Sequence, residues 1–167
     1  ETAALAGWRD RFYVREAMQD GLYQALTAMF PHLPPLVIVA IAELMTYVCT
    51  AVVRGRYWTG QTKWYVSDNH NTVGWLRDRT SKHVIVQFLL RILGLAEATW
   101  RFATLSAYIR TYHNLVPDHM TRRRWKEAIA LLEKEGFVKV EIGEAWKFYM
   151  NEIHRHHEAN LGALVAM

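Results

Sequence analysis

The chain has 167 residues, of which 51% are hydrophobic and 22% are charged. This length suits one domain with a hydrophobic core, and the composition excludes an intrinsically disordered chain. The formal net charge of +4 is compatible with binding to nucleic acid or to an anionic membrane and does not decide between them. Cys49 is the single cysteine, which excludes an internal disulfide and favours an intracellular, reducing compartment.

Residues 9–30 are predicted to form one amphipathic helix, because apolar side chains recur there at helical spacing. The prolines that follow, Pro31, Pro34 and Pro35, are expected to end it. We therefore expect residues 1–34 to be an N-terminal helical segment. Residues 36–39 are β-branched and bounded by prolines, which leaves two alternatives open, a short buried strand or the start of the next helix.

The rest of the chain alternates between strand and helix patterns. Strands are predicted near residues 63–68, 102–110 and 137–142, and helices near residues 40–54, 71–77, 82–100, 117–135 and 144–158. This alternation predicts an α/β domain with a partly parallel sheet. We place its core at residues 35–142 and a C-terminal helix and tail at residues 143–167.

A membrane span is the competing interpretation of residues 35–53, which are almost entirely apolar and close to bilayer-spanning length. Glu43 lies near the middle of this segment, where a charge costs about 2.5 to 3.5 kcal/mol on insertion scales. The cost favours a buried segment of a globular domain over a membrane span.

Three carboxylates are predicted on three separate elements. Asp68 follows a strand, at the edge where open α/β sheets build their sites, while Glu43 lies on the preceding helix and Asp118 begins a later one. Carboxylates brought together in this way suit Mg²⁺ or Mn²⁺. Asp68 and Asp118 also suit ordinary helix caps, but a lone carboxylate on the apolar helix of Glu43 is costly to bury.

Several short motifs occur in a characteristic order. They are Ala42-Glu43-Leu44, then Trp64-Tyr65-Val66-Ser67-Asp68-Asn69, then Tyr108-Ile109-Arg110-Thr111-Tyr112-His113-Asn114, and finally Pro117-Asp118 with Thr121-Arg122. In this order they resemble the ribonuclease H-like domain of tyrosine-recombinase (DIRS-type) and related retroelement reverse transcriptases. The resemblance covers about residues 36–122, roughly half of the chain.

The resemblance implies a ribonuclease H-like mixed sheet flanked by helices. It implies that Glu43, Asp68 and Asp118 bind two divalent metals, Mg²⁺ or Mn²⁺, and that the domain cleaves the RNA strand of an RNA–DNA hybrid. Basic residues near these motifs are expected to hold the nucleic-acid backbone: Arg77, Arg79, Lys82, Arg122 and Arg124.

The chain also departs from the family pattern. The family begins with a β-meander whose first strand carries a further essential Asp, whereas the N-terminal strands are expected here to be missing or replaced by a helix. Asp10 is the early candidate for that carboxylate. Two hypotheses follow: a metal-dependent nuclease, active or inactive, and a non-catalytic subunit that uses its seven Trp and eight Tyr to bind other protein chains, including at a membrane.

Histidines supply the remaining candidates. His70, His113 and His119 lie near the acidic motifs and suit either proton transfer or a surface position. Glu152, His154, His157 and Glu158 lie together near the C-terminus, where an exposed helix end is favoured over a transition-metal site.

Overall fold

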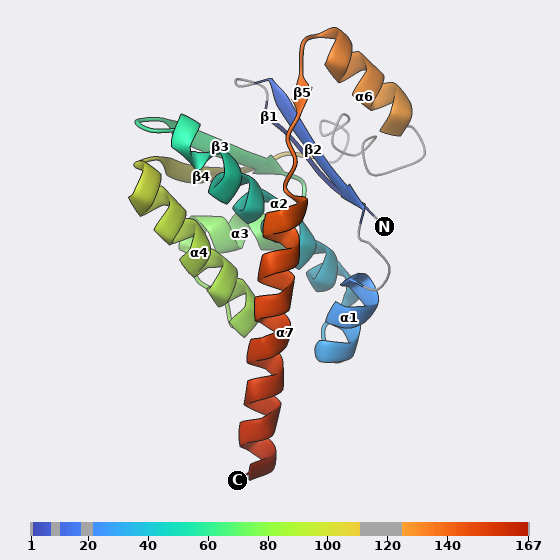
Figure 1. The fold of residues 1–167 in the computed structure, drawn as a ribbon, viewed down its shortest axis with the longest axis vertical. Helices are drawn as coiled ribbons and strands as arrows, with labels where there is room; N and C mark the ends of the chain where they lie inside the picture. The colour runs from blue at the N-terminus through green and yellow to red at the C-terminus, as the bar shows by residue number, and fades with distance from the viewer. Residues whose placement is uncertain (1, 8–10, 18–21, 111–124, 167) are drawn as a thin grey trace.

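The computed structural model describes residues 2–7, 11–17, 22–110 and 125–166, which form a mixed α/β structure (Figure 1). The elements follow one another as β1 (Thr2–Gly7), β2 (Phe12–Ala17), α1 (Leu22–Met29), α2 (Pro35–Arg54), the 3-10 turn η1 (Gly55–Tyr57), β3 (Thr62–Ser67), α3 (His70–Asp78), α4 (Val84–Trp100), β4 (Ala103–Tyr108), α6 (Trp125–Lys134), β5 (Val138–Lys139) and α7 (Gly143–Ala166).

The described strands form two small sheets. Strands β1 and β2 make an antiparallel hairpin, and β5 adds to β2 in parallel, which gives the order β1-β2-β5. Strands β3 and β4 pair in parallel, with Thr62 opposite Ala103 and Ser67 opposite Tyr108. Each sheet therefore contains a parallel pair, which confirms the predicted α/β class with partly parallel pairing.

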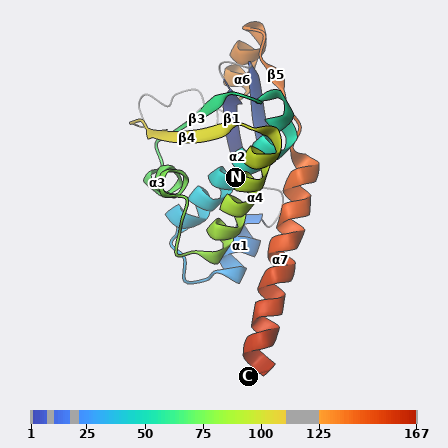
Figure 2. The same ribbon diagram turned by 90° about the vertical axis from the view of Figure 1, so that its left-hand side faces the viewer.

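The β3–β4 pair has one covered face and one open face. Tyr65, Ser67 and Thr104 are buried, whereas Trp64 and Leu105 on the opposite face are 61% and 46% exposed. Figure 2 shows α2, α3 and α4 on the same side of this pair. The alternation follows from the strand geometry, since successive side chains point to opposite faces.

Helix α2 is the central helix of the fold. Pro35 occupies its first turn, where proline is tolerated because the first N–H groups have no intrahelical acceptor. Residues 36–39 therefore belong to this helix, which decides between the two alternatives left open by the sequence. The helix packs against α4, α7, α3 and β1. It ends at Gly55, where an added Cβ would lie 2.5 Å from Cδ1 of Trp100, so this close approach requires glycine.

The predicted helix over residues 9–30 is wrong. Residues 12–17 form strand β2, paired with β1, and among the described residues of this range only 22–29 are helical. Phe12, Tyr13 and Val14 are all buried, because the main core covers one face of β2 and α6 covers the other. A strand covered on both faces lacks polar alternation, and its apolar run also fitted a helical face. The expectation that helix replaces the N-terminal strands fails with it.

Most other predicted elements are confirmed. Strands β3 and β4 and helices α3 and α4 lie within a few residues of their predicted bounds. The C-terminal strand is shorter than predicted, since only residues 138–139 pair with β2. The start predicted for the helix at residue 117 lies outside the described residues, and α6 continues to Lys134.

The main hydrophobic core joins segments that the sequence assigned to different regions. It includes Phe12 and Leu26 from the N-terminal part, Ile41 from α2, and Trp146 and Ile153 from α7. Described residues from all three predicted regions therefore contribute to one main core. Beyond that core α7 continues toward the C-terminus as an extended rod (Figure 1).

Candidate metal-binding site

Glu43 and Asp68 meet at the carboxyl end of β3. Glu43 lies on α2 between the buried residues Ala42 and Leu44, and Asp68 follows the last residue of β3, Ser67. The negative charge of Asp68 raises the pKa of the Glu43 carboxyl. The structure therefore brings together two of the three carboxylates predicted from the sequence.

The Glu43 carboxyl group is poorly solvated. Burial, followed by the charge of Asp68, raises its pKa from 4.5 to about 7, and a hydrogen bond with the Asn69 side chain acts in the opposite direction. Its Oε2 atom is buried and has no hydrogen-bond partner within the described part of the chain. Buried polar atoms normally have a partner, so this oxygen is a candidate ligand for a cation.

Asn69 connects the Glu43 carboxylate to the loop that follows β3. Its N–H donates to Ser67 Oγ at 3.0 Å, and its Oδ1 accepts from the N–H of Asn71 at 3.0 Å, which caps α3. The capping bond occupies Oδ1, so the amide NH₂ is the group that can donate to Glu43. The loop after β3 is thus held in the conformation that places Asp68 beside Glu43.

The buried Tyr65 hydroxyl lies close enough to both carboxylates to respond to their charges. Burial, and next the charge of Glu43, raises the pKa of its hydroxyl above the ordinary value, while a hydrogen bond with the Ser67 side chain opposes the shift. Its ring contacts Tyr47 edge-to-face at a centroid distance of 5.1 Å. Tyr65 therefore stays neutral and contributes a fixed hydroxyl dipole at this edge.

The donor set fits a hard divalent cation. Mg²⁺ and Mn²⁺ prefer carboxylate oxygens, and a cation between Glu43 and Asp68 would neutralise their repulsion and give the buried oxygen of Glu43 a partner. Among the described residues no group of three or more His, Cys, Asp or Glu side chains forms a metal site. Asp118, the third predicted ligand, lies outside the described residues, so the described site consists of two carboxylates.

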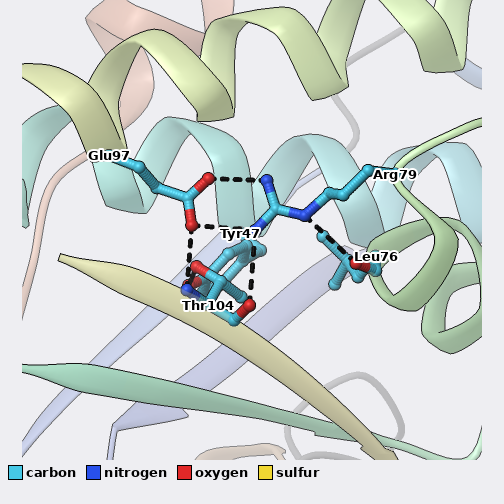
Figure 3. A network of polar contacts seen from close by, with 5 residues as sticks. All are labelled: Tyr47, Leu76, Arg79, Glu97 and Thr104. Atoms are coloured by element: carbon cyan, nitrogen blue, oxygen red, sulfur yellow. Dashed lines mark hydrogen bonds and ion pairs between the residues drawn. The ribbon is translucent and has the colours of Figure 1, made fainter.

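Arg79 is engaged in the interior contacts shown in Figure 3. Its guanidinium donates to both oxygens of Glu97 at 2.6 and 2.8 Å and to the carbonyls of Leu76 and Thr104. The same Glu97 carboxylate accepts the Thr104 N–H at 2.8 Å, and the Thr104 hydroxyl bonds to that of Tyr47 at 2.6 Å. This network ties α3, α4 and β4 together and occupies the group predicted to bind a nucleic-acid backbone.

The other basic residues predicted to bind the nucleic-acid backbone have varied environments. Arg77 is exposed and paired with Asp78 at 2.9 Å, and Lys82 is exposed. Arg122 and Arg124 lie outside the described residues. Of the five basic residues, Arg77 and Lys82 are thus the two whose charges the structure places at the surface.

The predicted histidine candidates also include residues inside and outside the described part of the chain. His113 and His119 lie outside the described residues, whereas His70 begins α3 and stacks on Tyr108. On α7, Glu152 pairs with Arg155, and the ring of His157 contacts Phe30. The C-terminal His and Glu residues that are described do not form a metal-binding group.

Three features of this site were not assigned a role from the sequence. They are the amide of Asn69, the hydroxyl of Tyr65 and the Arg79–Glu97 pair. The sequence contains a local signal for the Asn69 cap, since an Asn that precedes a short helix commonly caps it. Tyr65 and the pair had none, because Glu43 lies 22 residues from Tyr65 and Glu97 lies 18 residues from Arg79 along the chain.

Comparisons with protein-family models, with curated proteins and with solved structures found no match to this chain.

Proposed function

We propose that the chain is a ribonuclease H-like domain of retroelement type whose chemistry is metal-dependent cleavage of RNA in an RNA–DNA hybrid. The observation that carries the proposal is the buried oxygen of Glu43 beside Asp68, which has no hydrogen-bond partner among the described residues. A retained carboxylate pair of this kind costs folding free energy, and a divalent cation offsets that cost.

The order of elements supports the same proposal. A β-hairpin precedes the helix that carries Glu43, and a parallel strand pair with intervening helices follows, with Asp68 at a strand end. This matches the motif order of the family more closely than the helical N-terminus expected from the sequence. Before α2 the described residues form two strands where the family has three, and Asp10, the early acidic candidate, lies outside them.

In this function Glu43 and Asp68, with Asp118, would hold Mg²⁺ or Mn²⁺. When bound, the metal would supply Lewis acidity at the scissile phosphate and would lower the pKa of a water molecule. Asn69 orients the Glu43 carboxylate through its amide. The neutral Tyr65 hydroxyl and the apolar residues of α2 keep water away from the inner side of the pair. Arg77 and Lys82 would contact the phosphate backbone.

The direct test is hydrolysis of an end-labelled RNA–DNA hybrid in Mg²⁺ or Mn²⁺. Asp68→Asn and Glu43→Gln should each reduce the rate by at least about 100-fold, because even residues that only support metal ligands cost 10- to 100-fold. Glu135→Gln is the control, since it changes an exposed Glu after α6 that has no role in the proposed site and should keep the wild-type rate. A rate indifferent to Asp68→Asn rules out the assignment.

A non-catalytic subunit is the second candidate function, and the open face of the β3–β4 pair favours it. Trp64, Val66 and Leu105 are 61%, 43% and 46% exposed on that face. Exposed apolar clusters commonly mark protein–protein contacts. Isolation of the chain in a stable complex with another protein, together with a lack of hydrolysis, would favour this function over the nuclease.

A further inference from the structure

The carboxyl ends of β3 and β4 bring two exposed aromatic rings to the edge occupied by the carboxylates. The parallel register places Tyr108 opposite Ser67, so the residues after β3 and the last residue of β4 meet at one edge. His70, the first residue of α3, is two residues beyond Asp68, a separation of at most about 7 Å along the chain.

The rings of His70 and Tyr108 form a parallel stack. Their centroids are 3.9 Å apart and their planes differ by 14°. His70 is exposed, and Tyr108 retains 43% of its accessible surface. A stacked pair in a protein core is ordinary packing, but this pair offers a flat π surface to solvent.

Hydrogen bonds hold the elements that carry the two rings in place. The N–H of Ile109 donates to Ser67 O at 2.9 Å, and Ser106 Oγ donates to Val73 O at 2.9 Å, which fixes β4 against β3 and α3. Asn69 caps the helix that begins with His70. The two rings are therefore positioned before any ligand arrives, which reduces the entropy cost of binding one.

We propose that the His70–Tyr108 stack is a base-stacking platform for one unpaired nucleotide next to the carboxylate site. The inference rests on the proposed nuclease function and adds a preference in binding for hybrids that adjoin a single-stranded nucleotide. Aromatic side chains bind unstacked bases through their π faces, with little dependence on base identity. A base within a continuous duplex is already stacked on both sides, so a blunt hybrid cannot use the platform.

The test measures binding without cleavage, in EDTA, by fluorescence anisotropy. The probes are a labelled RNA–DNA hybrid with a short single-stranded RNA overhang and the same hybrid with an abasic site at the first overhang nucleotide. The wild-type protein should bind the intact overhang at least about fivefold more tightly, the lower end of the effect of one base–aromatic stack.

The variants separate stacking from a structural role. Tyr108→Leu removes the π face at similar volume and should abolish the preference for the intact overhang, whereas Tyr108→Phe keeps the ring and should preserve it. Trp64→Leu is the matched control, because Trp64 is an exposed aromatic on the opposite face of the same strands. Thermal melting of each variant confirms that it is folded.

Each outcome is decisive. Loss of the preference in Tyr108→Leu alone supports the platform. A preference that survives Tyr108→Leu, a wild-type protein that does not discriminate the two probes, or equal losses in Tyr108→Phe and Tyr108→Leu overturns it. Failure of the platform is distinguishable from failure of the nuclease function, because Asp68-dependent hydrolysis is measured separately and does not require Tyr108.

Discussion

The carboxyl group of Glu43 lies on a helix whose neighbouring side chains are buried, close to a second carboxylate. In water a Glu side chain is stabilised as an anion by hydration. Here the described protein supplies one hydrogen bond, from Asn69, and leaves Oε2 without a partner. The chain thus retains a group that weakens its own folded state, which is typical of functional sites.

The first prediction concerns the pH dependence of stability in metal-free buffer. The pKa of Glu43 rises from 4.5 to about 7 on folding, so the folded chain holds a proton that the unfolded chain has lost between these values. Protonation of Glu43 therefore adds to the free energy of unfolding. This contribution is complete below pH 4.5 and is lost as the pH rises through 7, which lowers the free energy of unfolding by about 3 kcal/mol in total. Glu43→Gln should therefore gain about 3 kcal/mol relative to wild type between pH 4 and pH 8.

Urea denaturation at several pH values measures this difference. Glu135→Gln, which changes an exposed residue after α6, should show no such pH-dependent gain. A constant difference between wild type and Glu43→Gln across the range would contradict the raised pKa. Adding Mn²⁺ at pH 8 should stabilise the wild type and not Glu43→Gln, because metal binding to the folded state shifts the unfolding equilibrium.

At the scale of elements, side-chain hydrogen bonds set the positions of α3, α4 and β4. Arg79 at the end of α3 adopts a positive φ of 55° and reaches Glu97 on α4, which in turn accepts the Thr104 N–H of β4. Ser106 and Thr72 make further contacts from β4 to α3 and from α3 to α2. These bonds hold the ends of β3 and β4, and hence Asp68 and Tyr108, at one edge.

The second prediction follows from the environment of that ion pair. Glu97→Ala should destabilise the protein by about 2 to 3 kcal/mol, because Arg79 and the Thr104 N–H both lose their acceptor. The cost is below the 3 to 5 kcal/mol of a fully buried pair, since the Arg79 side chain is 33% exposed. Urea denaturation provides the measurement.

Asp78→Ala is the matched control for Glu97→Ala. It removes the acceptor of Arg77, but that pair is exposed, with side chains 67% and 53% accessible. Exposed ion pairs are screened by solvent, so the unfolding midpoint should not change measurably. A similar destabilisation in both variants would contradict the structural role assigned to the Arg79–Glu97 pair.

At the scale of the whole molecule, the fold decides how the apolar helix α2 is covered. Residues 35–57 are long and apolar enough to cross a membrane, with a mean hydropathy of 2.3 in the most apolar window. The protein itself buries 67% of that window, chiefly through α4, α7, α3 and the β1–β2 hairpin. A helix with its apolar sides already covered gains little from lipid.

The third prediction is that the chain remains in the aqueous phase in a detergent phase-partition experiment. Immunoblotting of both phases gives the measurement. Leu36→Ser, which removes a 75% exposed apolar side chain of α2, should leave the distribution unchanged. Recovery of the folded wild-type chain mainly in the detergent phase would contradict the burial of α2 and favour the membrane interpretation.

Local signals in the sequence determined the central part of the fold. Strand β3 has aromatic and β-branched residues, Asn69 is a capping residue, and α4 has a long apolar helical period. Asp68 was placed correctly at a strand end for these reasons. The unusual position of Glu43 on an apolar helix was also visible, because burying a lone carboxylate is costly wherever the chain folds.

Only the tertiary structure decided the N-terminal hairpin and the contacts of the site. Phe12, Tyr13 and Val14 form a strand because β1, β5 and α6 surround them, and β5 and α6 lie more than 100 residues away in the sequence. The bidentate bond of Arg79 and the stack of His70 on Tyr108 likewise join residues 18 and 38 positions apart. Side-chain types can be read along a chain, whereas pairings between distant residues depend on packing, which local patterns do not encode.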